Sequence, residues 1–272
     1  MSGVDPCTFW HMARQRADAL LAERGLAPSR TDAAASIRAG TVRLGRDGPR
    51  LVKPSQLVAD NAELVVEEGR RYASRGGLKL ERALEALGID VGGRDCLDVG
   101  ASTGGFTDCL LQGGAARVIA LDVGHGQLDW PLRNDPRVEV MERVNARDLR
   151  PSDLSLRPDL ATIDVSFISL AKVLPAVAAC LAPEGELLAL VKPQFELGRG
   201  RVARGGVVRD PGERREAVLA AAQAARETGL GVLGFAPSGL PGPKGNLETF
   251  VWCVRDRAGI QDLESALSGV AA

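Results

Sequence analysis

The sequence has 272 residues, of which 25% are charged and 45% hydrophobic, and its formal net charge is −1. This composition is typical of a globular protein with room for one large α/β domain and a small one. It contains no apolar run near the roughly 18 residues of a membrane helix and no signal-peptide core. Because the five cysteines form no C-x-x-C pair, we expect a cytoplasmic protein without a disulfide framework or a metal site.

The first part of the chain predicts a small basic module. Residues 1–11 match no element and are expected to form a disordered extension. Residues 1–75 carry 12 Lys and Arg against 9 Asp and Glu, an excess that suits a nucleic-acid surface. The module at 12–66 is predicted to hold two helices and a small sheet: a helix between Ala13 and Gly25, a helix capped by Ser29 and Asp32 and ended by Gly40, and strands at 41–44 and 63–66.

Arginines spread along this module could bind RNA or simply solvate its surface. Residues 67–75 show no periodicity and are predicted to be a linker to the rest of the chain. Tyr72, within this linker, could stack on an RNA base or pin the linker to a neighbouring domain. The candidate RNA-binding residues are Arg14, Arg16, Arg30, Arg38, Arg43, Arg70, Arg71, Tyr72 and Arg75.

A glycine-rich turn organises the second predicted domain, residues 76–272. A short buried strand at 96–99 leads into the turn at 100–105 and then into a helix, as in a Rossmann-like nucleotide site. The dinucleotide fingerprint is broken, because Ser102 stands where its second glycine should be. The carboxylate of Asp98 suits an ammonium group and would repel a diphosphate.

A second acid, Asp122, ends the strand predicted at 117–122, where it can accept hydrogen bonds from ribose hydroxyls. An ammonium partner followed by a ribose partner fits S-adenosylmethionine better than NAD; the alternative is a glycine turn that only packs. A polar loop at 145–148 is expected at the edge of the adenine pocket. The predicted cofactor residues are Asp98, Gly100, Ala101, Ser102, Thr103, Gly104, Gly105, Phe106, Asp122, Asn145, Ala146, Arg147 and Asp148.

Strands and helices alternate through this second domain, which predicts a doubly wound, mainly parallel sheet with its ligand site at the C-terminal strand ends. Further strands are predicted at 139–141, 160–164, 187–193, 231–235 and 249–254, and helices at 78–87, 106–111, 170–181 and 211–228.

Asp164, Lys192 and Glu248 each lie at or beside the end of a predicted strand. Lys192 closes an apolar run, where burial lowers a lysine pKa and neighbouring carboxylates raise it. Such a group can orient or deprotonate a hydroxyl, although an ion network without chemistry is the alternative. Lys79 lies off the apolar stripe of its helix and by itself indicates a surface lysine.

Catalytic motifs that the sequence lacks narrow the choice of methyl acceptor. Residues 164–167 lack the Asp/Asn-Pro-Pro-aromatic pattern of enzymes that methylate base amines, and no cysteine has the setting of a pyrimidine-methylating nucleophile. The remaining carboxylates and lysines suit a ribose hydroxyl.

Residues 74–80, 98–108, 122–138 and 192–196 resemble the TlyA family, 2′-O-ribose methyltransferases of ribosomal RNA. These proteins have an S4 domain ahead of a domain of the FtsJ/RrmJ type. The resemblance covers roughly residues 12–255, and the family's Lys-Asp-Lys-Glu catalytic tetrad would fall on Lys79, Asp164, Lys192 and Glu248. It thereby makes Lys79 a catalytic candidate.

The resemblance implies a Rossmann-like class I methyltransferase domain preceded by an S4-like RNA-binding domain, with S-adenosylmethionine as cofactor. It further implies cytidines of 16S or 23S rRNA within ribosomal subunits as targets, near helix 44 and helix 69, and capreomycin susceptibility. Residues 70–73 replace the Arg-x-Trp-Val linker of mycobacterial members. We expect a monomer that binds neither DNA nor membranes.

Three alternatives stand beside this prediction. They are a small-molecule methyltransferase using the same cofactor, a non-catalytic rRNA-binding or assembly factor, and a membrane-lytic protein. The basic N-terminal module argues against the first, and the complete tetrad argues against the second. No strongly amphipathic cationic helix supports the third.

Overall fold

The computed structural model describes residues 14–38, 40–66, 71–198, 200–202 and 205–270. The predicted extension at 1–11 and the predicted RNA ligand Arg70 lie outside these ranges. The chain divides into two compact units, Met1–Arg71 and Tyr72–Ala272. None of the helices within the described ranges combines the length and the apolar character needed to cross a membrane.

The first unit packs two helices against short strands around a small apolar core. The Ser29 hydroxyl accepts a hydrogen bond from the Asp32 amide at 3.2 Å, which confirms the predicted helix cap. Strand β2 pairs with β4 and strand β1 with β3, both antiparallel. The elements are β1 (Arg14–Arg16), α1 (Ala17–Glu23), α2 (Arg30–Arg38), β2 (Val42–Leu44), β3 (Leu57–Ala59) and β4 (Leu64–Val66).

The first helix is shorter than predicted. Residues 14–16 form β1 instead of the first helical turn, because their backbone pairs with β3, a strand that the sequence did not predict. An Arg-Gln-Arg segment has no apolar residue to place it on a helical stripe, so the strand pairing decides its conformation.

The second unit contains a seven-stranded sheet in the order β10-β11-β9-β8-β5-β6-β7. The five strands from β9 to β7 are parallel, and β11 runs antiparallel between β9 and β10. This confirms the predicted mainly parallel sheet. The strands are β5 (Asp95–Val99), β6 (Arg117–Asp122), β7 (Val138–Glu142), β8 (Leu160–Ile163), β9 (Glu186–Val191), β10 (Leu230–Pro237) and β11 (Thr249–Arg255).

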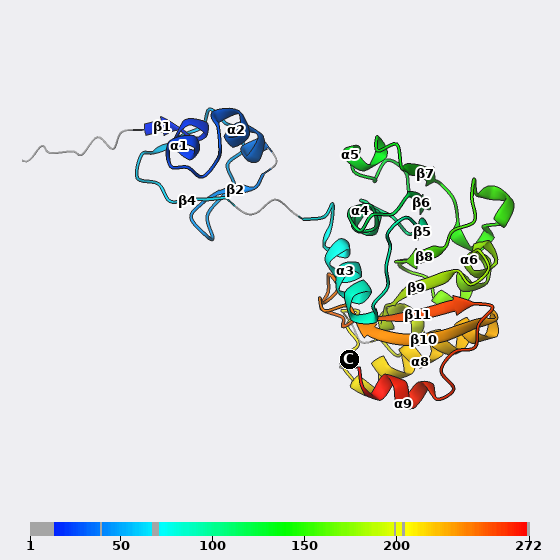
Figure 1. Ribbon diagram of the computed structural model, residues 1–272. Coiled ribbons are helices and arrows are strands. Elements are labelled where there is room, and N and C mark those ends of the chain that lie inside the picture. Colours follow the sequence, from blue (N-terminus) through cyan, green and yellow to red (C-terminus); the bar gives the residue numbers. More distant parts are fainter. Residues whose placement is uncertain (1–13, 39, 67–70, 199, 203–204, 271–272) are drawn as a thin grey trace, which may run out of the picture. The chain divides into compact units, whose positions relative to one another are not determined.

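Helices cover both faces of this sheet (Figure 1). Leu187, Ala189 and Val191 of β9 pack in the core with α6, α8 and α9, whereas Leu188 and Leu190 pack in the core with α3 and α4. The helices are α3 (Arg75–Leu87), α4 (Gly105–Gln112), α5 (Trp130–Arg133), α6 (Leu174–Cys180), α7 (Pro193–Glu196), α8 (Pro211–Glu227) and α9 (Leu263–Ser268), with 3₁₀ turns η1 (Ala146–Asp148), η2 (Pro151–Asp153) and η3 (Leu170–Lys172).

The predicted linker at 67–75 is corrected at its C-terminal end. Ser74 caps α3, so the helix begins at Arg75 and includes the glycines that were expected to precede it. Tyr72 is only 5% exposed, and its hydroxyl donates to the Glu81 carboxylate at 3.0 Å. A Cβ atom at Gly77 would overlap the Tyr72 ring. Of the two roles predicted for Tyr72, base stacking is therefore wrong, and the ring pins the chain to the second unit.

Candidate active site

The alternation of side chains along the sheet brings two predicted catalytic residues, Lys192 and Glu248, to one face. Lys192 follows β9 with the same parity as Leu188 and Leu190, which pack in the α3 core. Glu248 directly precedes β11, and the β11–β9 ladder pairs Thr249 with Val191. The next step along both strands therefore places Glu248 beside Lys192.

Lys192 and Asp164 form the more accessible of two ion pairs at this edge. Lys192 Nζ lies 2.5 Å from Asp164 Oδ1 and donates to Ser166 Oγ at 3.0 Å. The side chains of Lys192 and Asp164 are 12% and 24% exposed. A lysine ammonium has three N–H donors, and the hydrogen bond to Ser166 uses one of them, so Lys192 can also donate to a ligand oxygen.

Lys79 and Glu248 form the buried pair. Lys79 Nζ lies 2.6 Å from Glu248 Oε2, and the two side chains are 9% and 1% exposed. The surface position indicated by the helix pattern of Lys79 is therefore wrong. A buried charge needs a close partner to offset its lost hydration, and this pair ties α3 to the chain before β11.

The glycine-rich turn contacts the tetrad directly. Gly100 has a φ of +88°, and a Cβ atom there would lie 2.5 Å from the Asp164 carbonyl oxygen. The Asp164 amide donates to the Val99 carbonyl at 2.9 Å. Ser102 and Thr103, at the tip of the turn, are exposed. A ligand on this turn would therefore lie next to Asp164.

Asp122 lies where the turn meets the loops after β6 and β7. Its carboxylate accepts hydrogen bonds from the amides of Ser102 at 2.8 Å and Gly124 at 2.6 Å. The Val144 amide donates to the Asp122 carbonyl at 3.1 Å, which brings the predicted adenine edge beside the predicted ribose partner. Of that edge, Asn145, Arg147 and Asp148 are exposed, whereas Ala146 is buried in the core.

Asp98 has a different place from the one predicted. Its carboxylate is completely buried and accepts hydrogen bonds from Thr107 Oγ at 2.7 Å and Thr162 Oγ at 3.3 Å. Burial, helped by the negative charge of Asp164, raises the pKa of Asp98 to about 7. The predicted direct contact with a ligand ammonium is therefore wrong, and Asp98 instead joins α4 to β8 behind the turn.

Other predicted cofactor residues also lie inside the domain. The Phe106 ring packs against Phe250, with centroids 5.9 Å apart, so its predicted ligand contact is wrong. This occurs because α4 turns its first residues toward α3. A Cβ atom at Gly105 would overlap Ser74 Oγ, so this glycine permits the close approach of α3. Ala101, Gly104 and Gly105 are buried and form the inner side of the turn.

In the first unit, two of the predicted RNA-binding residues, Arg16 and Arg30, lie at the carboxylate of Asp18. Arg16 donates to both oxygens of the Asp18 carboxylate, at 3.0 and 2.7 Å, and Arg30 Nη2 lies 3.7 Å away. These contacts lower the pKa of the buried Asp18 carboxyl, chiefly through the Arg16 hydrogen bonds. The other candidates are placed separately: Arg14, Arg38 and Arg71 are exposed, Arg43 donates to the Gly48 carbonyl, and Arg75 donates to the Pro241 carbonyl in the second unit.

The sequence did not single out two residues that the structure places beside Lys192. Ser166 accepts its hydrogen bond, and Phe167 is 91% exposed although its φ is +64°. The Phe167 ring lies 5.1 Å from the ring of Phe195 in α7. An aromatic residue three positions after a strand-end acid was the available signal.

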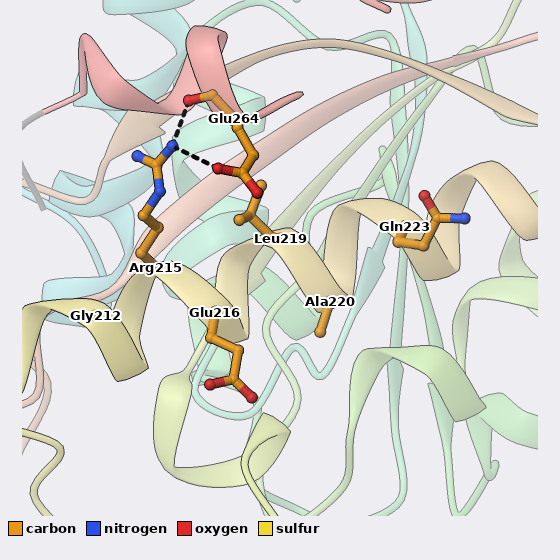
Figure 2. A pocket seen from close by; sticks show the side chains of 7 residues that line it. All are labelled: Gly212, Arg215, Glu216, Leu219, Ala220, Gln223 and Glu264. Carbon is orange, nitrogen blue, oxygen red and sulfur yellow. Dashed lines mark hydrogen bonds and ion pairs between the residues drawn. The ribbon is translucent and has the colours of Figure 1, made fainter. Parts of the chain in front are cut away.

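A groove of about 560 Å³ lies elsewhere, between α8 and α9 (Figure 2). Arg215 bridges it by donating to the Glu264 carbonyl at 2.5 Å, and Leu219 and Gln223 also line it. Because α8 and α9 pack on the sheet face opposite α3, this groove is separate from the tetrad.

Comparisons with known proteins agree with this geometry. The model of the FtsJ-like methyltransferase family matches residues 72–255. The 16S/23S rRNA (cytidine-2′-O)-methyltransferase TlyA of Mycobacterium tuberculosis is 54% identical over 241 residues, which are 88% of this chain and 89% of the relative. Hemolysin A of Brachyspira hyodysenteriae is 39% identical over 86% of this chain and 97% of its own. The solved structure of a hemolysin candidate from Streptococcus thermophilus is 40% identical, covers 95% of this chain and 94% of its own, and has a TM-score of 0.72. The chain therefore belongs to the FtsJ-like methyltransferases and, among them, to the TlyA family.

Proposed function

We propose that this protein methylates the 2′-hydroxyl of a cytidine ribose in ribosomal RNA, within a ribosomal subunit, using S-adenosylmethionine. The observation that carries the proposal is the position of Lys192. Its ammonium is paired with Asp164 and donates to Ser166 at the accessible edge of the sheet, directly beside the glycine-rich turn, and it can also donate to a ligand oxygen. A hydroxyl oxygen bound there would lie next to whatever the turn holds.

The residues around the turn fit the proposed cofactor. Gly100 gives the close backbone approach, and each carboxylate oxygen of Asp122 accepts one backbone hydrogen bond and so retains a lone pair for a ribose hydroxyl. When bound, S-adenosylmethionine supplies an electrophilic methyl group on a sulfonium. The protein's part is to hold the ribose oxygen in line with that methyl through Lys192, because alignment contributes most of the rate in such transfers.

Two features support RNA as the substrate. The first unit presents exposed arginines on β1 and α2, which suit phosphates. Phe167 is almost fully exposed and directly follows Ser166, which binds Lys192, and RNA-binding proteins use exposed aromatic rings to stack on unpaired bases. The M. tuberculosis relative, named for action on 16S and 23S rRNA, agrees with this substrate class.

The test measures methyl transfer from labelled S-adenosylmethionine to isolated small and large ribosomal subunits, with the modified position mapped on the rRNA. We expect one 2′-O-methylcytidine per target subunit and no transfer to free cytidine. Lys192→Ala should slow transfer about 10³-fold and retain cofactor binding by calorimetry. Lys172→Ala, which changes an exposed lysine in η3, is the matched control. Undiminished transfer by Lys192→Ala, or transfer to free cytidine alone, would refute the proposal.

A further inference from the structure

The segment Lys192 to Glu196 contacts the loop after β8 at three successive points. Lys192 holds the start of the loop through Asp164 and Ser166. The Phe195 ring packs against Phe167 in the middle. Glu196 binds the end of the loop, so a short stretch of chain fixes the whole loop.

The Glu196 contact uses both carboxylate oxygens. Oε2 accepts a hydrogen bond from Ser169 Oγ at 2.6 Å, and Oε1 accepts one from the Leu170 amide at 2.9 Å. Ser169 in turn caps η3 by accepting from the Ala171 amide at 3.3 Å. The carboxylate therefore fixes the point at which the loop ends and η3 begins.

The loop needs such support because its central residue cannot hold its own conformation. Phe167 has a φ of +64°, in the left-handed region that aromatic residues rarely adopt. The residue is 91% exposed, so burial contributes little to holding it there. Contacts on either side of Phe167 must therefore maintain the strained backbone and the outward direction of the ring.

We infer that Glu196 is a positioning residue that holds Phe167 in place to receive the target base. The inference rests on the proposed RNA methylation. It assigns a task to Glu196, which the proposed function leaves without a role although it lies in the same motif as Lys192.

The acceptor atoms of Glu196, more than its negative charge, are what the loop requires. Burial raises the pKa of the Glu196 carboxyl, so this location does not favour the charged form. A glutamine can accept from the Leu170 amide through its carbonyl and donate to Ser169 Oγ through its amide. Glu196→Gln should therefore retain the function, and Glu196→Ala should lose it.

The experiment compares Glu196→Ala, Glu196→Gln, Phe167→Ala and the double variant Glu196→Ala/Phe167→Ala in the full chain. The steady-state constants are measured with the ribosomal subunit that the wild type methylates. Calorimetry with S-adenosylmethionine and thermal unfolding verify that each variant is folded. Glu227→Ala, an exposed glutamate of α8, is the control.

We expect Glu196→Ala to raise the KM for the subunit about tenfold, in line with the loss of two hydrogen bonds, with unchanged cofactor affinity. Glu196→Gln should remain within about twofold of the wild type. In the Phe167→Ala background, Glu196→Ala should add less than about twofold, because both changes act through the same ring.

Three results would overturn the inference: a normal KM for Glu196→Ala, a Glu196→Gln variant as impaired as Glu196→Ala, or effects of Glu196→Ala and Phe167→Ala that multiply in the double variant. Each of these requires an active wild type. Failure of the proposed function is distinguished from them, since a wild type that transfers no methyl to either subunit would refute that proposal instead.

Discussion

The charged groups at the C-terminal edge of the sheet form two layers that differ in their access to solvent. In the inner layer, Lys79 and Glu248 are almost fully buried and Asp98 is completely buried. In the outer layer, Lys192 and Asp164 retain exposed surface. A buried charge depends on fixed partners to offset its lost hydration, whereas a partly solvated charge can exchange water for a ligand. The inner layer should therefore control stability, and the outer layer should control methyl transfer.

In the inner layer we expect the largest effect from Asp98, whose protonation should make the stability of the folded protein depend on pH. The pKa of this carboxyl is about 7 in the folded protein and near 3.8 when unfolded, so folding favours its protonated form. Its stabilising contribution is complete below about pH 4, declines as the pH rises and is lost above about pH 7. The difference between the two pKa values corresponds to about 4 kcal/mol.

Urea unfolding between pH 5 and 8.5 measures this contribution. Asp98→Asn keeps a neutral group at the site, so its free energy of unfolding should fall less with rising pH than that of the wild type. The control is Asp90→Asn, at an exposed loop position. Parallel stability curves for Asp98→Asn and the wild type would contradict a protonatable inner layer.

In the outer layer we expect the largest effect from Lys192, on the rate of methyl transfer. Lys192→Ala is expected to slow single-turnover methyl transfer about 10³-fold, equivalent to about 4 kcal/mol, because the ribose oxygen loses its positioning donor. Its unfolding free energy should change by about 1 kcal/mol, since both partners of this pair are partly solvated. The distinction between the layers would fail if Lys192→Ala greatly lowered the free energy of unfolding and slowed methyl transfer only slightly.

Glu248 offers the converse test. Glu248→Ala leaves the Lys79 ammonium buried without its partner, and we expect the free energy of unfolding to fall by about 3 kcal/mol. Lys79→Met combined with Glu248→Leu removes both charges and should regain most of that loss, to within about 1 kcal/mol of the wild type. A double variant as unstable as Glu248→Ala would show that the pair acts through packing and not through charge.

The fold of the second unit could be predicted closely because its strands are apolar runs bounded by turns. The strand predicted at 117–122 is β6, and the helix predicted at 211–228 is α8 to within one residue. In the first unit, β1 reads Arg-Gln-Arg and has no apolar residue to indicate a strand, and it forms a strand by pairing with β3. Local pattern cannot predict an element whose stability comes from a distant partner.

The sequence correctly predicted which edge of the sheet holds the site, but it did not predict which of the site residues are buried. Strand parity indicates which face Asp98 occupies, but not that α4 closes that face over it through Thr107. The same limit explains why the sequence did not predict the burial of Phe106. Phe167 was missed for another reason, since its exposed, strained conformation depends on Phe195 and Glu196, which lie about 30 residues away along the chain.

Ser166 provides the smallest and most discriminating test of the outer layer. It accepts a hydrogen bond from Lys192 Nζ at 3.0 Å and is itself exposed, so Ser166→Ala removes one contact and leaves the Asp164 pair in place. We expect methyl transfer to slow about fivefold, close to 1 kcal/mol, with unchanged unfolding free energy and cofactor affinity. Ser152→Ala, at an exposed position in η2, is the control. If Ser166→Ala slowed transfer as severely as Lys192→Ala, the hydroxyl itself would have to act on the substrate, and Lys192 would serve only to hold it.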